Sequence, residues 1–274
     1  MNASAQPLIV AHRGASHDAP ENTQAAFDLA WEQGADAIEC DVHLTADGQI
    51  VCIHDDTTGR TTGGEKGTGL VVAESTAEEL RKLDVGSWKD PAFAGEPVPL
   101  LRDVLASLPA GKGILIEVKV GPEIVPALTA LLRDTATGGL EGHRVTVMGF
   151  DAAMVKDAKA ALPAVLPGVT VNWLTRFAPH PKTKLPTLTT DEIIEQLAAI
   201  NADGLGCKAL EYYVNQDFVE RLRAEAYGLH VWTVDDPAVG RHFVSLGFDS
   251  ITTNRPGWLG EQLDLRGPSE IANE

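Results

Sequence analysis

The segment "GADAIECDVHLTADGQIVCIHDD", residues 34–56, gathers ionisable side chains on two runs that otherwise resemble buried strands. Glu39 and Asp41 are two residues apart in the first run, and His54 ends the second. Because residues i and i+2 of a strand point to the same face of a sheet, the two carboxylates should lie side by side. Grouped carboxylates can bind a hard divalent cation, and a histidine beside them can carry a proton near neutral pH.

A hairpin turn should bring the two runs together. The Asp47-Gly48 pair is a strong signal for a two-residue turn, and the connection is too short for a crossover helix. We therefore expect 49–54 to return antiparallel beside the first run. With a two-residue loop, Asp41 would lie directly opposite His54.

Charged residues also end two other apolar runs. "GILIEVK" carries Glu117 and Lys119, and "LIVAHRG" carries His12 and Arg13. Each motif alone is ordinary for a core strand or a surface ion pair. Parallel α/β folds, however, build their active sites at the carboxyl ends of several strands, so together these motifs predict a single site.

Three carboxylates would repel one another strongly in a dry cavity unless a cation lies between them. Ligation by oxygen alone suits Mg²⁺ or Ca²⁺ and does not suit a zinc site built from Cys and His. A divalent ion beside Glu39, Asp41 and Glu117, together with Arg13 and Lys119, would leave a net positive centre. Such a centre could hold a phosphate in an acidic protein.

The two histidines at strand ends are the natural proton carriers. One of His12 and His54 would deprotonate a nucleophile while the other protonates a leaving oxygen, and the sequence does not assign which. The remaining ionisable side chains of the opening segment are interpreted as bystanders; they are His43, Asp55 and Asp56.

Short β-rich runs alternate with amphipathic helical stretches along the chain, which indicates βαβ units and a parallel sheet. The runs lie at 8–14, 37–42, 49–55, 113–119, 144–150, 169–175, 203–208, 229–235 and 249–254. Because the third of them returns in the hairpin, eight parallel strands remain. The sequence therefore predicts a (β/α)8 TIM barrel.

Residues 57–98 interrupt this alternation. The stretch is rich in Gly and Thr and contains one short helical pattern, "AEELRKL". It follows the second barrel strand and its hairpin, so we interpret it as a small inserted subdomain near the barrel mouth. A length of 274 residues suits a single barrel, and we expect residues 1–274 to form one domain.

The net charge of the chain excludes some classes of binding partner. It has 39 acidic and 22 basic residues, a formal charge of -17, and no run rich in Lys or Arg. Such a field repels nucleic acids and anionic membranes. No apolar stretch approaches the ~18 residues of a membrane span, and no basic signal-peptide start is present. We expect a cytoplasmic protein with a small-molecule substrate and no nucleic-acid or stable membrane partner.

The cysteines do not suggest a disulfide framework. Cys40, Cys52 and Cys207 are odd in number and lack metal-type spacing, so we expect three buried thiols.

Taken together, the motifs resemble those of the glycerophosphodiester phosphodiesterase family. The matching stretches follow one another over roughly 250 residues: "AHRG", "PENT", "IECDV", "IHDD", "LDVGSW", "VPLLRDVL", "ILIEVK", "VWTVD" and "ITTNRP". The resemblance implies a (β/α)8 barrel with an inserted subdomain that hydrolyses glycerophosphodiesters to glycerol 3-phosphate and an alcohol.

The resemblance also implies roles for the residues that the spacing singles out. It matches the divalent-metal ligands to Glu39, Asp41 and Glu117, with Mg²⁺ or Ca²⁺ as the cofactor. It matches the acid/base pair to His12 and His54.

Substrate contacts follow in the same way. The resemblance assigns phosphate contacts to Arg13 and Lys119, and a place in the site to Glu21 of "PENT". Trp232 ends a strand and would pack on the glycerol or the alcohol group.

The resemblance does not decide the role of two residues, Asn22 and Asp235. Asn22 of "PENT" either has a role in the site or caps the helix that follows. The family often has Asn where "VWTVD" has Asp235, and this extra negative charge bears on substrate preference without altering the core chemistry.

Two other functions compete with this interpretation. One is a related barrel phosphodiesterase that acts on lysophospholipids or other lipid head groups, which would need an apolar or basic docking surface. The other is a catalytically silent barrel that binds phosphodiesters. The preferred alcohol, the choice between Mg²⁺ and Ca²⁺, the route through a cyclic phosphate or by direct water attack, and the oligomeric state stay open.

Overall fold

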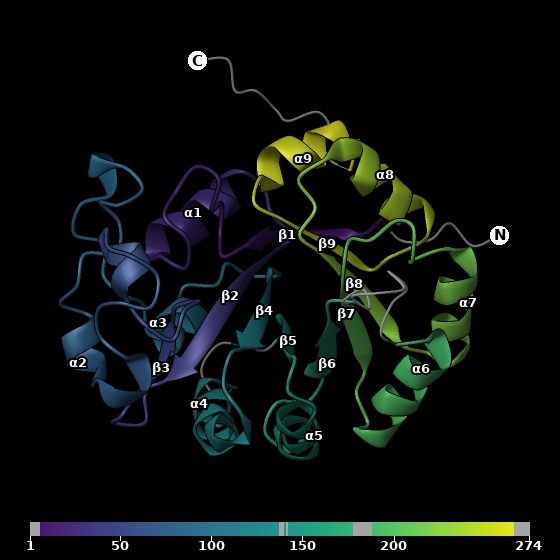
Figure 1. The fold of residues 1–274 in the computed structure, drawn as a ribbon, viewed down its shortest axis with the longest axis horizontal. Helices are drawn as coiled ribbons and strands as arrows, with labels where there is room; N and C mark the ends of the chain where they lie inside the picture. The colour runs from purple at the N-terminus through teal and green to yellow at the C-terminus, as the bar shows by residue number, and fades with distance from the viewer. Residues whose placement is uncertain (1–5, 137–139, 141, 178–187, 266–274) are drawn as a thin grey trace.

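The computed structural model describes residues 6–136, 140, 142–177 and 188–265. Within these residues eight parallel strands close into a ring, and the helices lie outside it (Figure 1). The predicted (β/α)8 barrel is confirmed. The strands are β1 (Leu8–His12), β2 (Ala37–Leu44), β4 (Gly113–Val118), β5 (Arg144–Gly149), β6 (Thr170–Thr175), β7 (Gly204–Lys208), β8 (Gly228–Trp232) and β9 (Ser250–Thr253).

Several of the helices that follow the strands begin at side-chain caps. Thr23, Asp151, Asn215 and Asp236 each accept a hydrogen bond from a backbone N–H of the first turn. These caps fix where the chain leaves the four corresponding loops. The helices are α1 (Gln24–Glu32), α3 (Leu101–Ala106), α4 (Val125–Ala136), α5 (Ala152–Ala161), α6 (Thr190–Ala199), α7 (Gln216–Ala224), α8 (Pro237–Ser245) and α9 (Pro256–Gln262).

The predicted hairpin is present, but its register was wrong by one residue. β3 (Ile50–Cys52) runs antiparallel to β2 outside the ring and pairs Cys52 with Val42. Continuing this register, the Ile53 N–H donates to Asp41 O at 3.0 Å, so Ile53 rather than His54 lies opposite Asp41.

The loop length causes the shift. The Thr45 N–H donates to Gln49 O at 2.9 Å, so three residues form the loop instead of two. Gly48 closes the turn with a φ of 74°, the left-handed conformation that three-residue hairpin loops require and that Gly adopts without strain.

Residues 57–98 form short turns of helix beside β3. They contain α2 (Ala77–Leu80), which begins with a Thr76 capping box, and three 3₁₀ segments, Gly59–Thr62, Val72–Glu74 and Pro91–Phe93. A small apolar cluster separate from the main core joins them to β3, made of Val51, Ile53, Val72, Ala77, Leu80, Val85, Val98 and Leu100. Its description as an inserted subdomain stays a prediction.

The three cysteines are free and buried, as expected. In the described ranges, every helix is too short or too polar to cross a bilayer.

Candidate active site

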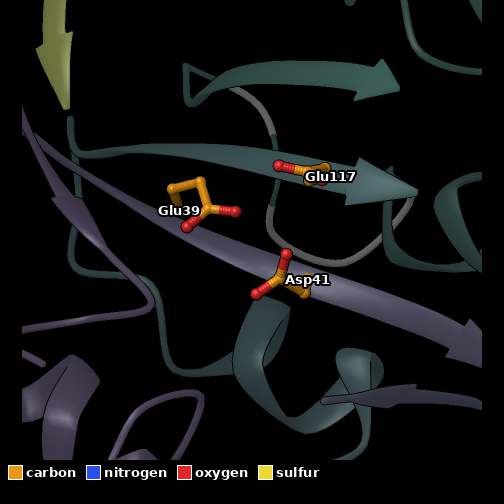
Figure 2. A group of neighbouring side chains, drawn as sticks. All are labelled: Glu39, Asp41 and Glu117. Carbon is orange, nitrogen blue, oxygen red and sulfur yellow. The ribbon is translucent and has the colours of Figure 1, made fainter. Parts of the chain in front are cut away.

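Three carboxylates converge at the carboxyl ends of β2 and β4. Glu39, Asp41 and Glu117 each present an oxygen, and these atoms all lie within 4.8 Å of one another. Figure 2 shows the three side chains pointing toward one another from the two strands. The parallel register explains the meeting, because Asp41 is the β2 partner of Glu117, and Glu39 follows the same face two residues earlier.

The chemistry of this cluster fits a hard divalent cation. Glu39 and Asp41 are fully buried, and in the described part of the chain Glu39 Oε1 has no hydrogen-bond partner. Burial raises the pKa of Glu39 well above its ordinary value, and the charges of Asp41 and Glu117 raise it further. The pKa of Glu117 is raised by burial and by Asp41. A bound cation would remove the cost of ionising both groups.

Asp41 differs because two cations flank it. Burial would raise its pKa, but Arg13 and Lys119 outweigh burial and lower the pKa to about 2. The Arg13 Nε lies 2.9 Å from Asp41 Oδ2, and the Lys119 Nζ lies 3.3 Å from Oδ1. Asp41 is therefore the carboxylate that stays ionised without a metal.

The two cations also contact the rest of the cluster. The Arg13 backbone N–H donates to Glu39 Oε2 at 2.9 Å, with φ of 58° at Arg13. The Lys119 ammonium donates to Glu117 Oε1 at 2.6 Å. Both side chains also line the cavity described below.

His12 lies at the end of β1 and contacts an amide. Its Nδ1 is 2.7 Å from Asn254 Oδ1 in the loop after β9. Burial, helped by the charge of Arg13, lowers the pKa of His12 to about 4. The ring is therefore neutral near pH 7.

His54 contacts a carboxylate instead. Its Nδ1 is 2.7 Å from Asp55 Oδ1, while Arg60 Nε donates to Asp55 Oδ2 at 2.8 Å. Burial lowers the pKa of His54. Burial would raise the pKa of Asp55, but the hydrogen bonds from Arg60 and His54 lower it to about 2. The predicted bystander role of Asp55 was therefore wrong, because its carboxylate orients His54.

Glu21 links the two halves of the site. Its Oε1 accepts from Arg13 Nη1 at 2.9 Å, and its two oxygens accept from Arg60 at 2.7 and 2.8 Å. Both of its oxygens are thus occupied by guanidinium groups. In this structure Glu21 holds the two arginines, and its predicted place in the substrate-binding site stays a prediction.

Asn22 does not cap α1, because that position belongs to Thr23, whose hydroxyl accepts from the Ala26 N–H. Asn22 is instead bonded twice to Asp41, through its own Nδ2 and Oδ1. Of the two interpretations left open for Asn22, the structure supports a place in the site.

A cavity of about 100 Å³ opens above these groups. Its polar side is lined by His12, Arg13, Glu39, His54, Glu117 and Lys119. Phe150, Arg176 and Trp232 form another part of its wall. The Phe150 and Trp232 rings meet edge to face at 5.7 Å, and the Arg176 guanidinium lies 3.9 Å from the centre of the Phe150 ring.

Sequence reasoning missed Arg60, Asp55 and Asn254. The adjacency of His54 and Asp55 in "IHDD" was an available signal, since a carboxylate next to a histidine often fixes its orientation. Arg60 lies in the stretch between the hairpin and α3, and Asn254 is 242 residues from His12, so neither could be paired with the site by spacing.

An eight-stranded α/β barrel with acidic, basic and histidine side chains gathered at the carboxyl ends of its strands is the architecture of a TIM-barrel enzyme. A sequence model of the glycerophosphoryl diester phosphodiesterase family matches residues 12–258. The chain belongs to this family.

Individual relatives agree with the match. YhdW of Bacillus subtilis, provisionally named a glycerophosphodiester phosphodiesterase, is 56% identical over 256 residues, covering 92% of this chain and 96% of its own. The glycerophosphodiester phosphodiesterase of Caldanaerobacter subterraneus is 34% identical, with the same coverage. A phosphodiesterase structure from Oleispira antarctica, in complex with its product sn-glycerol-3-phosphate, has a TM-score of 0.76 and 25% identity, covering 94% of this chain and 97% of that one.

Proposed function

We propose that this protein hydrolyses glycerophosphodiesters to glycerol 3-phosphate and an alcohol, with one divalent cation and two histidines. The main observation behind this proposal is a single cavity beside the carboxylate cluster, lined by His12, His54, Arg13 and Lys119. Family membership and the product named in the Oleispira structure support the same reaction.

Glu39, Asp41 and Glu117 would hold the cation, either Mg²⁺ or Ca²⁺, because their donors are all oxygens. When bound, the metal would neutralise the phosphate and lower the pKa of a hydroxyl that it contacts. Arg13 and Lys119 would contact the phosphate oxygens, since both cations line the cavity next to the cluster.

The partners of the two histidines suggest their roles. His54 is bonded to the carboxylate of Asp55, which stabilises a protonated ring, so we assign it as the general acid. His12 is bonded to a neutral amide and is held neutral by burial, so we assign it as the general base.

The proposed nucleophile is the glycerol 2-hydroxyl beside the phosphate. His12 takes the proton of this hydroxyl while its oxygen bonds to phosphorus. The bond from phosphorus to the alcohol oxygen breaks, and His54 protonates that oxygen. Water then opens the cyclic phosphate with the two histidines in reversed roles. Direct attack by water is the competing route, which predicts full activity on a substrate that lacks the 2-hydroxyl.

The wall formed by Phe150, Arg176 and Trp232 would contact the organic part of the substrate. Its rings offer an apolar surface for a glycerol or alcohol carbon chain, and Trp232 would make the substrate contact expected from the sequence.

The decisive experiment measures glycerol 3-phosphate release from glycerophosphocholine and glycerophosphoglycerol with Mg²⁺, Ca²⁺ or a chelator. Release that requires a metal supports the proposal. If glycerol 3-phosphate is released in the presence of chelator, the proposed metal requirement is wrong. If none is released with either ion, a protein that only binds phosphodiesters is favoured. A parallel assay with lysophosphatidylcholine in detergent tests the lipid alternative, which is favoured only if the lipid is the better substrate.

His12→Ala and His54→Ala should each lower turnover by ~10²-fold or more if these residues carry protons. Normal rates in both variants would defeat the assignment. The cytoplasmic location, the single-domain organisation and the absence of a stable membrane partner stay predictions.

A further inference from the structure

The carboxylate of Asp235, in the loop after β8, is saturated by the loop after β9. Its Oδ1 accepts from the Thr253 hydroxyl and from the Asn254 backbone N–H, both at 2.9 Å. Its Oδ2 accepts from Asn254 Nδ2 at 2.6 Å. Asp235 is exposed, but both of its carboxylate oxygens accept hydrogen bonds from protein groups. Of these groups, the Asn254 side chain is the one that connects Asp235 to the site.

The Asn254 amide continues the chain of hydrogen bonds into the site. Its Oδ1 lies 2.7 Å from His12 Nδ1 and accepts from the Ser16 hydroxyl at 2.9 Å. A single amide thus separates the Asp235 carboxylate from the ring of His12.

The chemistry of these groups determines which atoms carry protons. An ionised carboxylate only accepts hydrogen bonds, so Asp235 requires the NH₂ group of Asn254 to face it. The carbonyl oxygen of the same amide must then face His12. An amide oxygen accepts only, so the neutral ring of His12 must carry its proton on Nδ1 and leave a lone pair on Nε2.

We propose that Asp235 is a positioning residue that acts through Asn254 to hold His12 in the Nδ1–H tautomer. The role of His12 as general base rests on the proposed function, because only a ring with a free Nε2 can accept a proton from the substrate on its cavity side. The tautomer itself can be measured without any substrate.

Asp235→Asn is the test variant. Its Oδ1 still satisfies the Thr253 hydroxyl and the Asn254 N–H, but its NH₂ group then faces the NH₂ group of Asn254. Rotation of the Asn254 amide relieves this conflict and presents NH₂ to His12, so the ring proton moves to Nε2. We expect kcat to fall roughly 10-fold or more, with KM nearly unchanged, since general base catalysis is lost.

Exchanging the two residues should rescue the variant. In Asp235→Asn with Asn254→Asp, the new Asn NH₂ donates to the new carboxylate at 254, whose other oxygen accepts from His12 Nδ1. The donor direction is restored, and kcat should recover most of the loss. If Asp235 only stabilised the loop, kcat would not depend on the direction of the hydrogen bonds that link positions 235 and 254 to His12.

Asp236→Asn is the matched control. Asp236 is the next residue, and its carboxylate caps α8 by accepting from Ala238 N at 2.7 Å. The control removes the same charge one position away. It should lower the thermal stability without changing the His12 tautomer or kcat.

The direct readout is the long-range ¹H–¹⁵N spectrum of ¹⁵N-histidine-labelled protein near pH 7, with His12 signals identified by their loss in His12→Gln. The expected spectrum has a protonated Nδ1 in the wild type and a protonated Nε2 in Asp235→Asn. A protonated Nε2 in the wild type overturns the proposal, even if the variant fails to fold. An unchanged tautomer in a folded variant also overturns it. If the tautomer changes as expected but wild-type protein hydrolyses no diester, the proposed function fails and this inference stands.

Discussion

Asn22 and Asp41 are joined by two hydrogen bonds that run in opposite directions. Asn22 Nδ2 donates to Asp41 Oδ2 at 2.9 Å, and the Asp41 backbone N–H donates to Asn22 Oδ1 at 3.1 Å. The backbone of Asn22 is in the left-handed region, with a φ of 55°. The loop before α1 thereby fixes one carboxylate of the acidic cluster.

Removing this amide should weaken metal binding. Asn22→Gly keeps the left-handed backbone accessible but leaves Asp41 without its partner, and lost support of a metal ligand typically costs ~10–100-fold in affinity. We expect the Mg²⁺ or Ca²⁺ concentration for half-maximal activity to rise by that factor. Asn201→Gly is the control, since Asn201 has a φ of 56° and follows α6. An equal metal requirement in both variants would remove Asn22 from the site.

Local patterns were sufficient to predict the barrel and most of the cluster. The i, i+2 spacing of Glu39 and Asp41 and the apolar runs around them determine strand and face, because both depend on the residues themselves. The hairpin register was wrong by one residue, because a three-residue loop around Gly48 replaces the two-residue turn that Asp47-Gly48 suggested.

The hydrogen-bond partners of the proposed site residues could not be predicted from the spacing of residues along the sequence. Arg60 reaches Glu21 and Asp55 from the stretch after the hairpin, and Asn254 reaches His12 only because the ring closes β9 beside β1. Such contacts form only in the closed barrel, so the helix and strand periodicity of the sequence does not predict them.

Asp55 should matter for catalysis although it contacts no substrate. In Asp55→Asn the amide oxygen stays with Arg60, so an NH₂ group faces His54 Nδ1 and a protonated ring loses its anionic partner. We expect kcat to fall ~10²-fold with a small change in KM, measured by steady-state hydrolysis. Asp56→Asn, at the exposed next position, is the control and should keep normal kinetics. Equal kcat values for the two variants would contradict a role for Asp55.

Metal binding should stabilise the fold more at pH 8 than at pH 5. The pKa values of Glu39 and Glu117 are raised above the usual 4.5 in the metal-free fold, so the folded chain holds protons that the unfolded chain releases. The stability of the metal-free protein therefore falls as pH rises above about 4.5, and a cation that binds the ionised carboxylates offsets this loss. The Tm increase on adding Mg²⁺ or Ca²⁺ to chelator-treated protein is the measurement.

The low pKa values of Asp41 and Asp55 do not interfere with this test. Both are about 2 against a usual 3.8, so their stabilising contribution is present above pH 4 and lost as pH falls toward 2. Glu39→Gln is the control and should show a smaller metal-induced Tm increase at pH 8. A Tm increase that is the same at both pH values would mean that binding releases no protons.

Gly14 of "AHRG" should be essential to the fold of the loop. It has a φ of 80°, and a Cβ there would lie 2.5 Å from the Ala26 backbone of α1. Gly14→Ala should cost roughly 2–5 kcal/mol in the free energy of unfolding, from strain and overpacking together. Gly48→Ala is the control, with a φ of 74° and no described atom within 4 Å of its Cβ, and should cost only about 1–2 kcal/mol. Urea unfolding compares the two, and equal losses would mean that contact with α1 is not what excludes a side chain at Gly14.

Arg176 should set the charge preference for the alcohol group. Its guanidinium lies over Phe150 in the cavity wall and would repel a cationic choline more than a neutral glycerol. Arg176→Ala should raise kcat/KM for glycerophosphocholine relative to glycerophosphoglycerol by ~5-fold, about 1 kcal/mol for a charge pair near 4 Å in water. Arg255→Ala is the control, because Arg255 stacks on Trp258 at 4.1 Å in the same way but does not line this cavity. An unchanged ratio in Arg176→Ala would mean that the alcohol group binds away from this wall.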